Sequence, residues 1–169
     1  MADPIRAKLD TSSFDAGLTR LSGPLIEKLS ASMAVAGGQV LRDEAKRQAP
    51  VDDGVLRDAI YLAFKQGKTN DRRTVYAVSW TARLAPHGHL LEFGHWRVNA
   101  GRYDAQGQWK PSKTRLKTPK WVPAHPFLGP ARDIAGKAAI EAMLKRGRER
   151  LPELLREQDE PGTKPQGGA

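Results

Sequence analysis

The segment that most constrains the fold is AKRQAPVDDGVLRDAI, residues 45–60. Pro50 has no amide hydrogen to donate and pushes the residue before it out of the helical region, so a helix arriving from the N-terminal side ends there. We expect Asp53 to cap a new short helix, because its side chain can accept hydrogen bonds from the first free amides. Leu56 and Ile60 fall four residues apart, on one face of that helix. The segment therefore predicts a helix, a proline corner, a short capped helix and then a strand.

Two long helices are predicted on either side of this corner. Apolar residues at spacings of three and four predict one helix from Pro24 to about Gln48 and another from Ala131 to about Arg148. Pro152 is expected to kink or end the second helix, with a final turn at 153–157 as the alternative. Between the helices, the apolar runs at 61–64 and 74–81 flank the polar turn KTNDRR and predict a β-hairpin.

The second half of the chain predicts less regular structure. Residues 83–93 predict a short helix or irregular segment whose apolar side chains face inward, namely Leu84, Leu90, Leu91 and Phe93. Residues 95–122 hold three of the four tryptophans among glycines and prolines, which predicts a long loop or a projecting hairpin. The sequence thus predicts an α+β fold, with two long helices and short helical segments packed on a small antiparallel sheet. We expect one domain over residues 1–159, with 95–122 as an insertion, and a disordered tail over 160–169.

The middle of the first long helix consists almost entirely of small residues, ASMAVAGG at 31–38. Gly37 and Gly38 each cost roughly 1 kcal/mol relative to alanine inside a helix. We therefore expect another element to pack very close to them. That element is either the chain's own sheet or a second subunit.

The positive charge is concentrated in one segment. The net charge is +9, and residues 65–120 hold twelve Lys or Arg against three acids, whereas the other residues hold sixteen of each sign and sum to zero. This segment is either a solvated basic surface or a surface that contacts an acidic protein or nucleic acid.

The patterns that would indicate catalysis or metal binding are weak. His87, His89, Glu92 and His95 lie close in sequence but lack the spacing of a zinc site, so we expect loop histidines and no metal. Glu92 is the one acid expected to be partly buried, where its carboxylate would pair with a cation or accept backbone amides, and a structural brace is favoured over a catalytic role. The sequence shows no glycine-rich phosphate loop, no justified Ser/His/Asp order and no cysteine. It predicts a protein that is not an enzyme and has no cofactor.

Three motifs together resemble a known family. They are AKxxAPVDxGxLRxxI at 45–60, LLEFG at 90–94 and PAxPFLxPA at 123–131, the last followed by a helix. In this order and spacing they are similar to the tail-completion or neck proteins of long-tailed bacteriophages, the group typified by phage Hong Kong 97 and related to the minor tail protein Z of phage lambda. The resemblance covers roughly residues 25–151. The residues of these motifs that we assign a structural role are Pro50, Asp53, Gly54, Leu56, Glu92, Phe93, Gly94, Pro126, Phe127 and Pro130.

The resemblance implies a non-enzymatic virion protein that forms a ring, most simply of six copies, at the head-proximal end of the tail and joins the tail to the capsid. Its implied partners are further copies of itself and neighbouring neck, head-closure and tail tube or terminator proteins, with assembly in the host cytoplasm and no membrane contact. Contact with packaged DNA is an open alternative. Three departures from the family pattern are Asp53 and His95, where threonine is common, and Gly129, where arginine is common.

The basic insertion is the segment that we expect to meet a partner. Our hypothesis is that it docks on an acidic neighbouring protein, with its tryptophans as apolar anchors. The alternative is a nucleic-acid-binding module that uses the basic 65–120 segment and stacks its tryptophans on bases. The candidate partner-binding residues are Trp96, Arg97, Arg102, Trp109, Lys110, Lys113, Arg115, Lys117 and Lys120.

Overall fold

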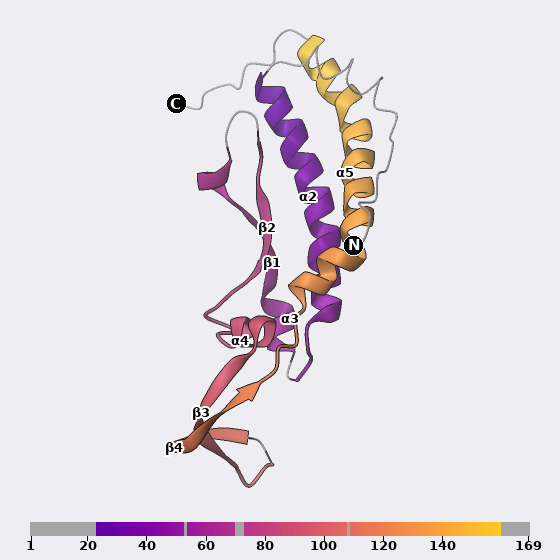
Figure 1. The fold of residues 1–169 in the computed structure, drawn as a ribbon. Coiled ribbons are helices and arrows are strands. Elements are labelled where there is room, and N and C mark those ends of the chain that lie inside the picture. Colours follow the sequence, from indigo (N-terminus) through magenta and orange to yellow (C-terminus); the bar gives the residue numbers. More distant parts are fainter. Residues whose placement is uncertain (1–22, 53, 70–72, 108, 160–169) are drawn as a thin grey trace, which may run out of the picture. The chain divides into compact units, whose positions relative to one another are not determined.

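The computed structural model describes residues 23–52, 54–69, 73–107 and 109–159, apart from the side chains of Trp109 and Pro111 (Figure 1). Asp53 and the tail at 160–169 lie outside the described residues, so the cap and the disordered tail stay predictions. The elements in chain order are α2 (Gly23–Gln48), α3 (Val55–Ala59), β1 (Ile60–Phe64), the 3-10 helix η1 (Gln66–Lys68), β2 (Tyr76–Trp80), α4 (Gly88–Phe93), β3 (His95–Tyr103), β4 (Trp109–Val122) and α5 (Leu128–Asp159).

The predicted α+β class is confirmed, with two long helices and antiparallel strands. The strands form two separate two-stranded sheets, β1–β2 and β3–β4, where the sequence predicted one sheet. The segment predicted as a loop or a hairpin at 95–122 is a hairpin with its own ladder. No described helix is both long enough and apolar enough to cross a membrane.

Contacts divide the chain into two compact units. The first comprises the described parts of Met1–Gln39, Phe64–Ala77 and Lys137–Ala169, and the second comprises those of Val40–Ala63 and Val78–Gly136. Helices α2 and α5 each contribute residues to both units.

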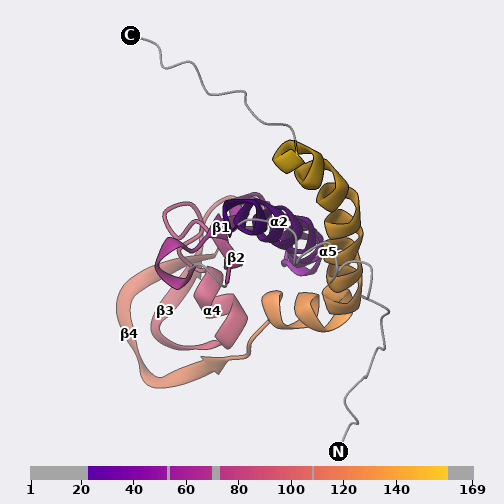
Figure 2. The same ribbon diagram turned by 90° about the horizontal axis from the view of Figure 1, so that it is seen from above.

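In the first unit, α2 and α5 lie side by side (Figures 1 and 2). Leu29, Leu151 and Leu154 form a buried cluster between them. The last long helix was predicted to reach about Arg148 and to kink or end at Pro152, whereas α5 continues through Pro152 to Asp159. A proline inside a helix costs about 3 kcal/mol, but burying a leucine contributes about 1.5–3 kcal/mol. The two leucines that flank the proline therefore offset its cost.

The small-residue stretch of α2 packs against α5. A Cβ atom at Gly37 would lie 2.5 Å from Met143 Cγ and 2.9 Å from the carbonyl oxygen of Ala139, so only glycine fits. The close neighbour that the sequence required is thus a helix of the same chain, rather than its sheet.

In the second unit, a buried cluster joins the corner to the start of α5. Its members are Ala45, Ala49, Leu56, Ala59, Ile60, Ala85, Phe127 and Ala131. Helix α2 ends at Gln48, just before Pro50, as predicted. Gly54 has the left-handed φ of 81° that glycine adopts readily, and it redirects the chain into α3. Leu56 and Ile60 are 3% and 2% exposed, which confirms them as one buried face.

Two inward-facing residues were predicted wrongly. Leu84 is 57% exposed and Phe93 is 72% exposed. Leu91 packs against the buried cluster, and Phe93 lies two positions further along α4, about 200° round the helix. The two side chains therefore cannot face the same core.

Candidate functional site: a basic hairpin on a braced corner

Glu92 fixes the start of α5. Its Oε2 accepts hydrogen bonds from the amides of Phe127 (2.8 Å) and Leu128 (3.0 Å), and its Oε1 accepts one from the amide of Gly129 (3.1 Å). This confirms the expectation that the carboxylate accepts backbone amides. The negative charge also lies at the positive end of the helix, where it is favourable.

The remaining amides of the first turn need no further partner. Pro130 has no amide hydrogen, and the amide of Ala131 donates to the carbonyl of Phe127 at 3.3 Å. The first amides of a helix lack partners within it. At the start of α5, the Glu92 carboxylate accepts hydrogen bonds from three such amides, and Pro130 has no amide hydrogen that needs an acceptor. Arginine is common in the family at the position of Gly129. A Cβ atom built at Gly129 would lie 3.8 Å from Glu92 Oε1, which is an ordinary contact, so a side chain can start there.

The structure brings the three family motifs together in the second unit. Leu56 of the first motif and Phe127 of the third belong to one buried cluster, and Leu91 of the second packs against it. The Phe127 ring meets Trp80 edge-on, with centroids 5.8 Å apart. The amide of His125 donates to the carbonyl of Leu91 at 2.8 Å, which adds a second link beside Glu92. Pro126 and Pro50 are exposed and act through the backbone directions that they fix.

The β3–β4 hairpin begins directly after this brace. Gly94 has φ 72°, and a Cβ atom there would lie 2.8 Å from the Trp121 ring and 2.9 Å from the carbonyl oxygen of Val122, so the chain turns into β3 where a side chain would not fit. Trp96 then pairs with Trp121 across the ladder. Further along, the register shifts on either side of Asn99, which twists and bends a hairpin locally.

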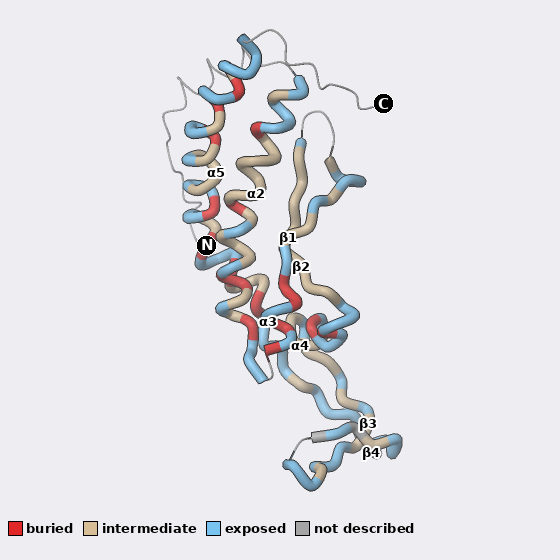
Figure 3. The backbone as a smooth tube through the Cα atoms, turned by 180° about the vertical axis from the view of Figure 1, so that it is seen from behind, coloured by how far each residue is buried: buried red, intermediate tan, exposed pale blue. Residues whose placement is uncertain are grey.

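The hairpin exposes large aromatic side chains. No described residue of 95–122 is fully buried (Figure 3). Trp96 is 62% exposed and Trp121 is 51% exposed, with ring centroids 5.3 Å apart and planes at 64°. Tyr103, nearer the tip, is 73% exposed. Such exposure of apolar area is unusual unless a partner covers it.

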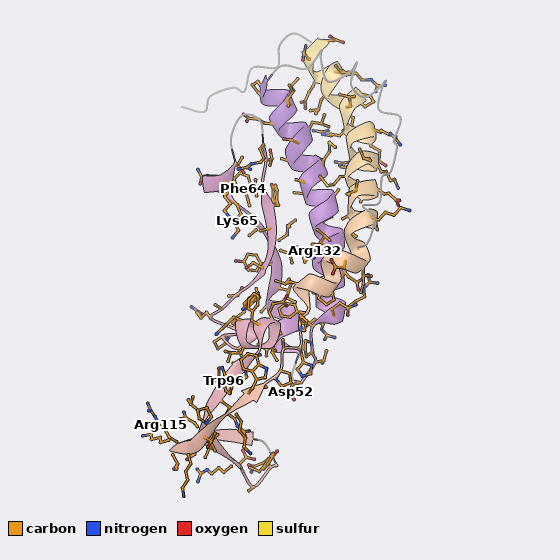
Figure 4. All side chains as sticks on the ribbon, in the orientation of Figure 1. Asp52, Phe64, Lys65, Trp96, Arg115 and Arg132 are labelled. Carbon is orange, nitrogen blue, oxygen red and sulfur yellow. The ribbon has the colours of Figure 1, made fainter. Side chains whose placement is uncertain are left out.

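The same hairpin carries most of the basic residues of the chain's positive segment. Residues 95–122 hold seven Lys or Arg and one acid, Asp104, a net charge of 7 − 1 = +6. Lys110 Nζ lies 2.8 Å from Asp104 Oδ2. The ladder places Arg97 opposite Lys120 and Arg102 opposite Lys110, and like charges directly opposite each other destabilise a ladder. Figure 4 shows Trp96 at the end of the hairpin nearer α4 and Arg115 farther along β4.

All the candidate partner-binding residues lie on this hairpin. Trp96 and Arg97 are on β3 near α4, Arg102 is on β3 toward the tip, and the others are on β4. The hairpin therefore gathers these residues on one projecting element. Trp109 is described only by its backbone, in register with Tyr103.

The histidines do not gather into a metal site. Within the described residues, no group of three His, Asp or Glu side chains is arranged to hold a metal ion. His87 and His89 flank Gly88 at the start of α4, and both are exposed.

The comparisons with known proteins identify one family. Residues 12–94, just under half of the chain, match the family model described as "Bacteriophage HK97-gp10, putative tail-component". Over this segment the chain is similar to that family. The matched segment contains two of the three motifs, and it ends where the hairpin begins. No match was found among curated proteins or among solved structures.

Sequence reasoning missed two features of the site. It placed Phe93 inside, although a helical-wheel count from Leu91 would have turned it outward. It also named Glu92 as the one partly buried acid, whereas Glu44 is only 5% exposed. Glu44 accepts hydrogen bonds from Arg47 and, at 2.6 Å, from Gln48 Nε2, its neighbours on α2. The apolar spacing of α2 already ran through this position, which is the signal that its side chain would be covered.

Proposed function

We propose that this HK97-gp10-like protein is a non-enzymatic structural protein of a phage virion, which forms a ring at the head-proximal end of the tail and joins the tail to the filled capsid. The observation that carries the proposal is the family match over residues 12–94. The convergence of the three motifs in one buried cluster supports it, because the third motif lies outside the matched segment yet packs with the first two.

Symmetry and the family resemblance both support the ring. A head-to-tail contact between identical copies either closes into a ring or grows into a filament. We propose a closed ring of six at the head–tail junction, assembled in the host cytoplasm, with the tail end as a template. Negative-stain images of the purified protein alone and with tails test the ring, and filaments or a persistent monomer on tails would contradict it.

Contact with neighbouring proteins is assigned to the hairpin. It projects from the braced corner, lies beyond the family match and carries the excess charge, so it is the part of the chain that is free to suit a particular neighbour. The neighbours are neck, head-closure and tail tube or terminator proteins. DNA that passes through the junction is the second candidate, because the same basic residues would attract phosphates.

A joining assay tests the function. Particles made without this protein should accumulate as separate heads and tails, and adding the purified protein should restore joined, infectious virions. Fully joined particles in its absence would contradict the proposal.

Deleting Val98–Thr118 tests the hairpin separately. The deletion removes most of the ladder but leaves the Glu92 brace, so circular dichroism should show that the helices are retained. Joining should be lost. If joining survives and DNA binding disappears, the hairpin is a nucleic-acid element instead.

A further inference from the structure

The hairpin has two chemically distinct parts. At its base, next to α4, lie three exposed aromatic residues, Phe93, Trp96 and Trp121, which we call the aromatic base. From the base toward the tip, the exposed side chains include six cations beside the apolar Val98 and Tyr103, and the six are Arg102, Lys110, Lys113, Arg115, Lys117 and Lys120. A partner that binds the hairpin must therefore cover apolar area at the aromatic base and neutralise positive charge along the strands.

The two tryptophans of the aromatic base are held in place before any partner arrives. Trp121 packs against the backbone of Gly94, where no Cβ would fit, and its ring meets Trp96 edge to face. Gly94 follows the helix whose Glu92 is tied to the start of α5 by three hydrogen bonds. A rigid aromatic pair loses little conformational entropy on binding, which is what an anchor of a protein interface requires.

The rest of the chain carries no net negative charge that would complement the hairpin. Outside 65–120, the sixteen basic and sixteen acidic residues cancel. Within the hairpin, Asp104 is the single acid. A second copy of this chain thus offers no net negative charge to match the hairpin, and charge complementarity favours a different, anionic partner.

Two observations favour a protein over nucleic acid as that partner. The two tryptophan rings meet edge to face, at 64°, so they do not form two parallel platforms on which successive bases stack. Duplex DNA presents phosphates and groove edges, which leave an exposed phenylalanine and two tryptophans without an apolar counterpart.

We propose that the hairpin docks a protein segment in which a bulky apolar side chain, seated on the aromatic base, is followed by several acidic residues that run along the cationic strands. This inference rests on the proposed function for the origin of the segment, a neighbouring virion protein. To the proposed function it adds the chemical character of the bound segment and the hairpin residues that bind it.

The test uses full-length protein and fluorescently labelled probes. One probe is a glutamate-rich peptide with two leucines at one end, the second has serines in place of the leucines at the same charge, and the third is duplex DNA. The leucine peptide should bind about tenfold more tightly than the serine peptide, and added salt should weaken the binding of both while this ratio is kept. Equal binding of the two peptides, no binding of either, or tighter binding of DNA with a logarithmic salt slope near −0.9 per phosphate would overturn the proposal.

Variants identify the surface. Phe93→Ser should abolish the preference for the leucine peptide, and because Phe93 lies on α4, outside the strand ladder, its loss leaves the register intact. Trp96→Ser should do the same, whereas Trp96→Phe should keep most of the preference. Lys117→Glu should lower the binding affinity for both peptides by the same factor. Ile134→Ser is the matched control, since Ile134 is 60% exposed on α5 and should not change binding.

The outcomes separate this inference from the proposed function. If wild-type protein joins heads to tails but Phe93→Ser keeps both joining and the peptide preference, the docking surface is wrong and the function stands. If the peptide preference is as expected but the protein does not join particles, the function is wrong and the docking surface stands.

Discussion

Removing the Glu92 carboxylate should destabilise the protein more than removing any exposed glutamate, because three backbone amides lose their acceptor at once. A hydrogen bond to a charged group contributes about 1.5–3 kcal/mol, and the helix-end charge contributes about 0.3–1 kcal/mol. The three bonds share one side chain and are not additive, and Glu92 is only half-buried. We therefore expect Glu92→Ala to lower the free energy of unfolding by about 2–4 kcal/mol.

The companion variant Glu92→Gln separates geometry from charge. The single carbonyl oxygen of glutamine can still accept hydrogen bonds from the amides at the start of α5. The negative charge is absent, however, and the glutamine NH2 group would face backbone N–H donors. We therefore expect the free energy of unfolding to fall by about 1–2 kcal/mol. At this chain length, 1 kcal/mol corresponds to about 2–4 °C in Tm. Glu92→Ala should thus lower Tm by roughly 5–15 °C.

The measurement is urea unfolding followed by circular dichroism, with m-values compared to confirm that the variants unfold from similar states. Glu141→Ala is the control, because Glu141 is an exposed glutamate on the same helix. Surface substitutions usually change stability by less than about 0.5 kcal/mol. If Glu92→Ala and Glu141→Ala agree within that margin, Glu92 does not hold the start of α5.

Three further predictions concern packing and charge. Leu56→Ala should lower the free energy of unfolding by roughly 2–5 kcal/mol, because the side chain is 3% exposed. A loss below about 1 kcal/mol in urea unfolding would show that the corner is not anchored in the core. Gly37→Ala should destabilise the protein despite alanine's better helix propensity. Gly136→Ala should stabilise it by up to about 1 kcal/mol, because no atom lies within 4 Å of a Cβ built there. Thermal melts that rank the two variants equally would argue against the close α2–α5 packing. The hydrogen bond from Arg150 lowers the pKa of Glu153. The resulting small stabilisation is present above the unfolded-state pKa and lost as pH falls through the folded-state value, so Arg150→Gln should raise the Glu153 pKa measured by NMR titration.

Local chemistry allowed the sequence to predict where the elements of the corner begin and end. Pro50 ends α2 because it removes a donor and restricts its predecessor, and no tertiary contact is needed for that effect. The apolar spacing of Leu56 and Ile60 likewise placed them in the core. The carboxylate of Glu92 was predicted to accept amides because an acid between apolar residues must be satisfied. Which amides it meets depended on α5 being brought to α4 from 35 residues away.

The misses have two physical reasons, namely burial by a distant segment at Pro152 and helix periodicity at Phe93. Pro152 is a helix breaker by itself, but Leu151 and Leu154 pack with Leu29, a residue more than a hundred positions earlier. Phe93 has the hydrophobicity of a core residue, but Leu91 had already taken the inward face of a six-residue helix.

The sequence alone determined the class of the fold, the corner, the motifs that point to the phage family and the segment that carries the charge, because each depends on residues close together along the chain. Tertiary structure alone decided that the three motifs meet in one cluster, that Gly37 faces Met143 on another helix, and that residues 95–122 form a hairpin with an aromatic base. These features depend on pairings between distant segments, whose register and exposed faces are set by packing in three dimensions.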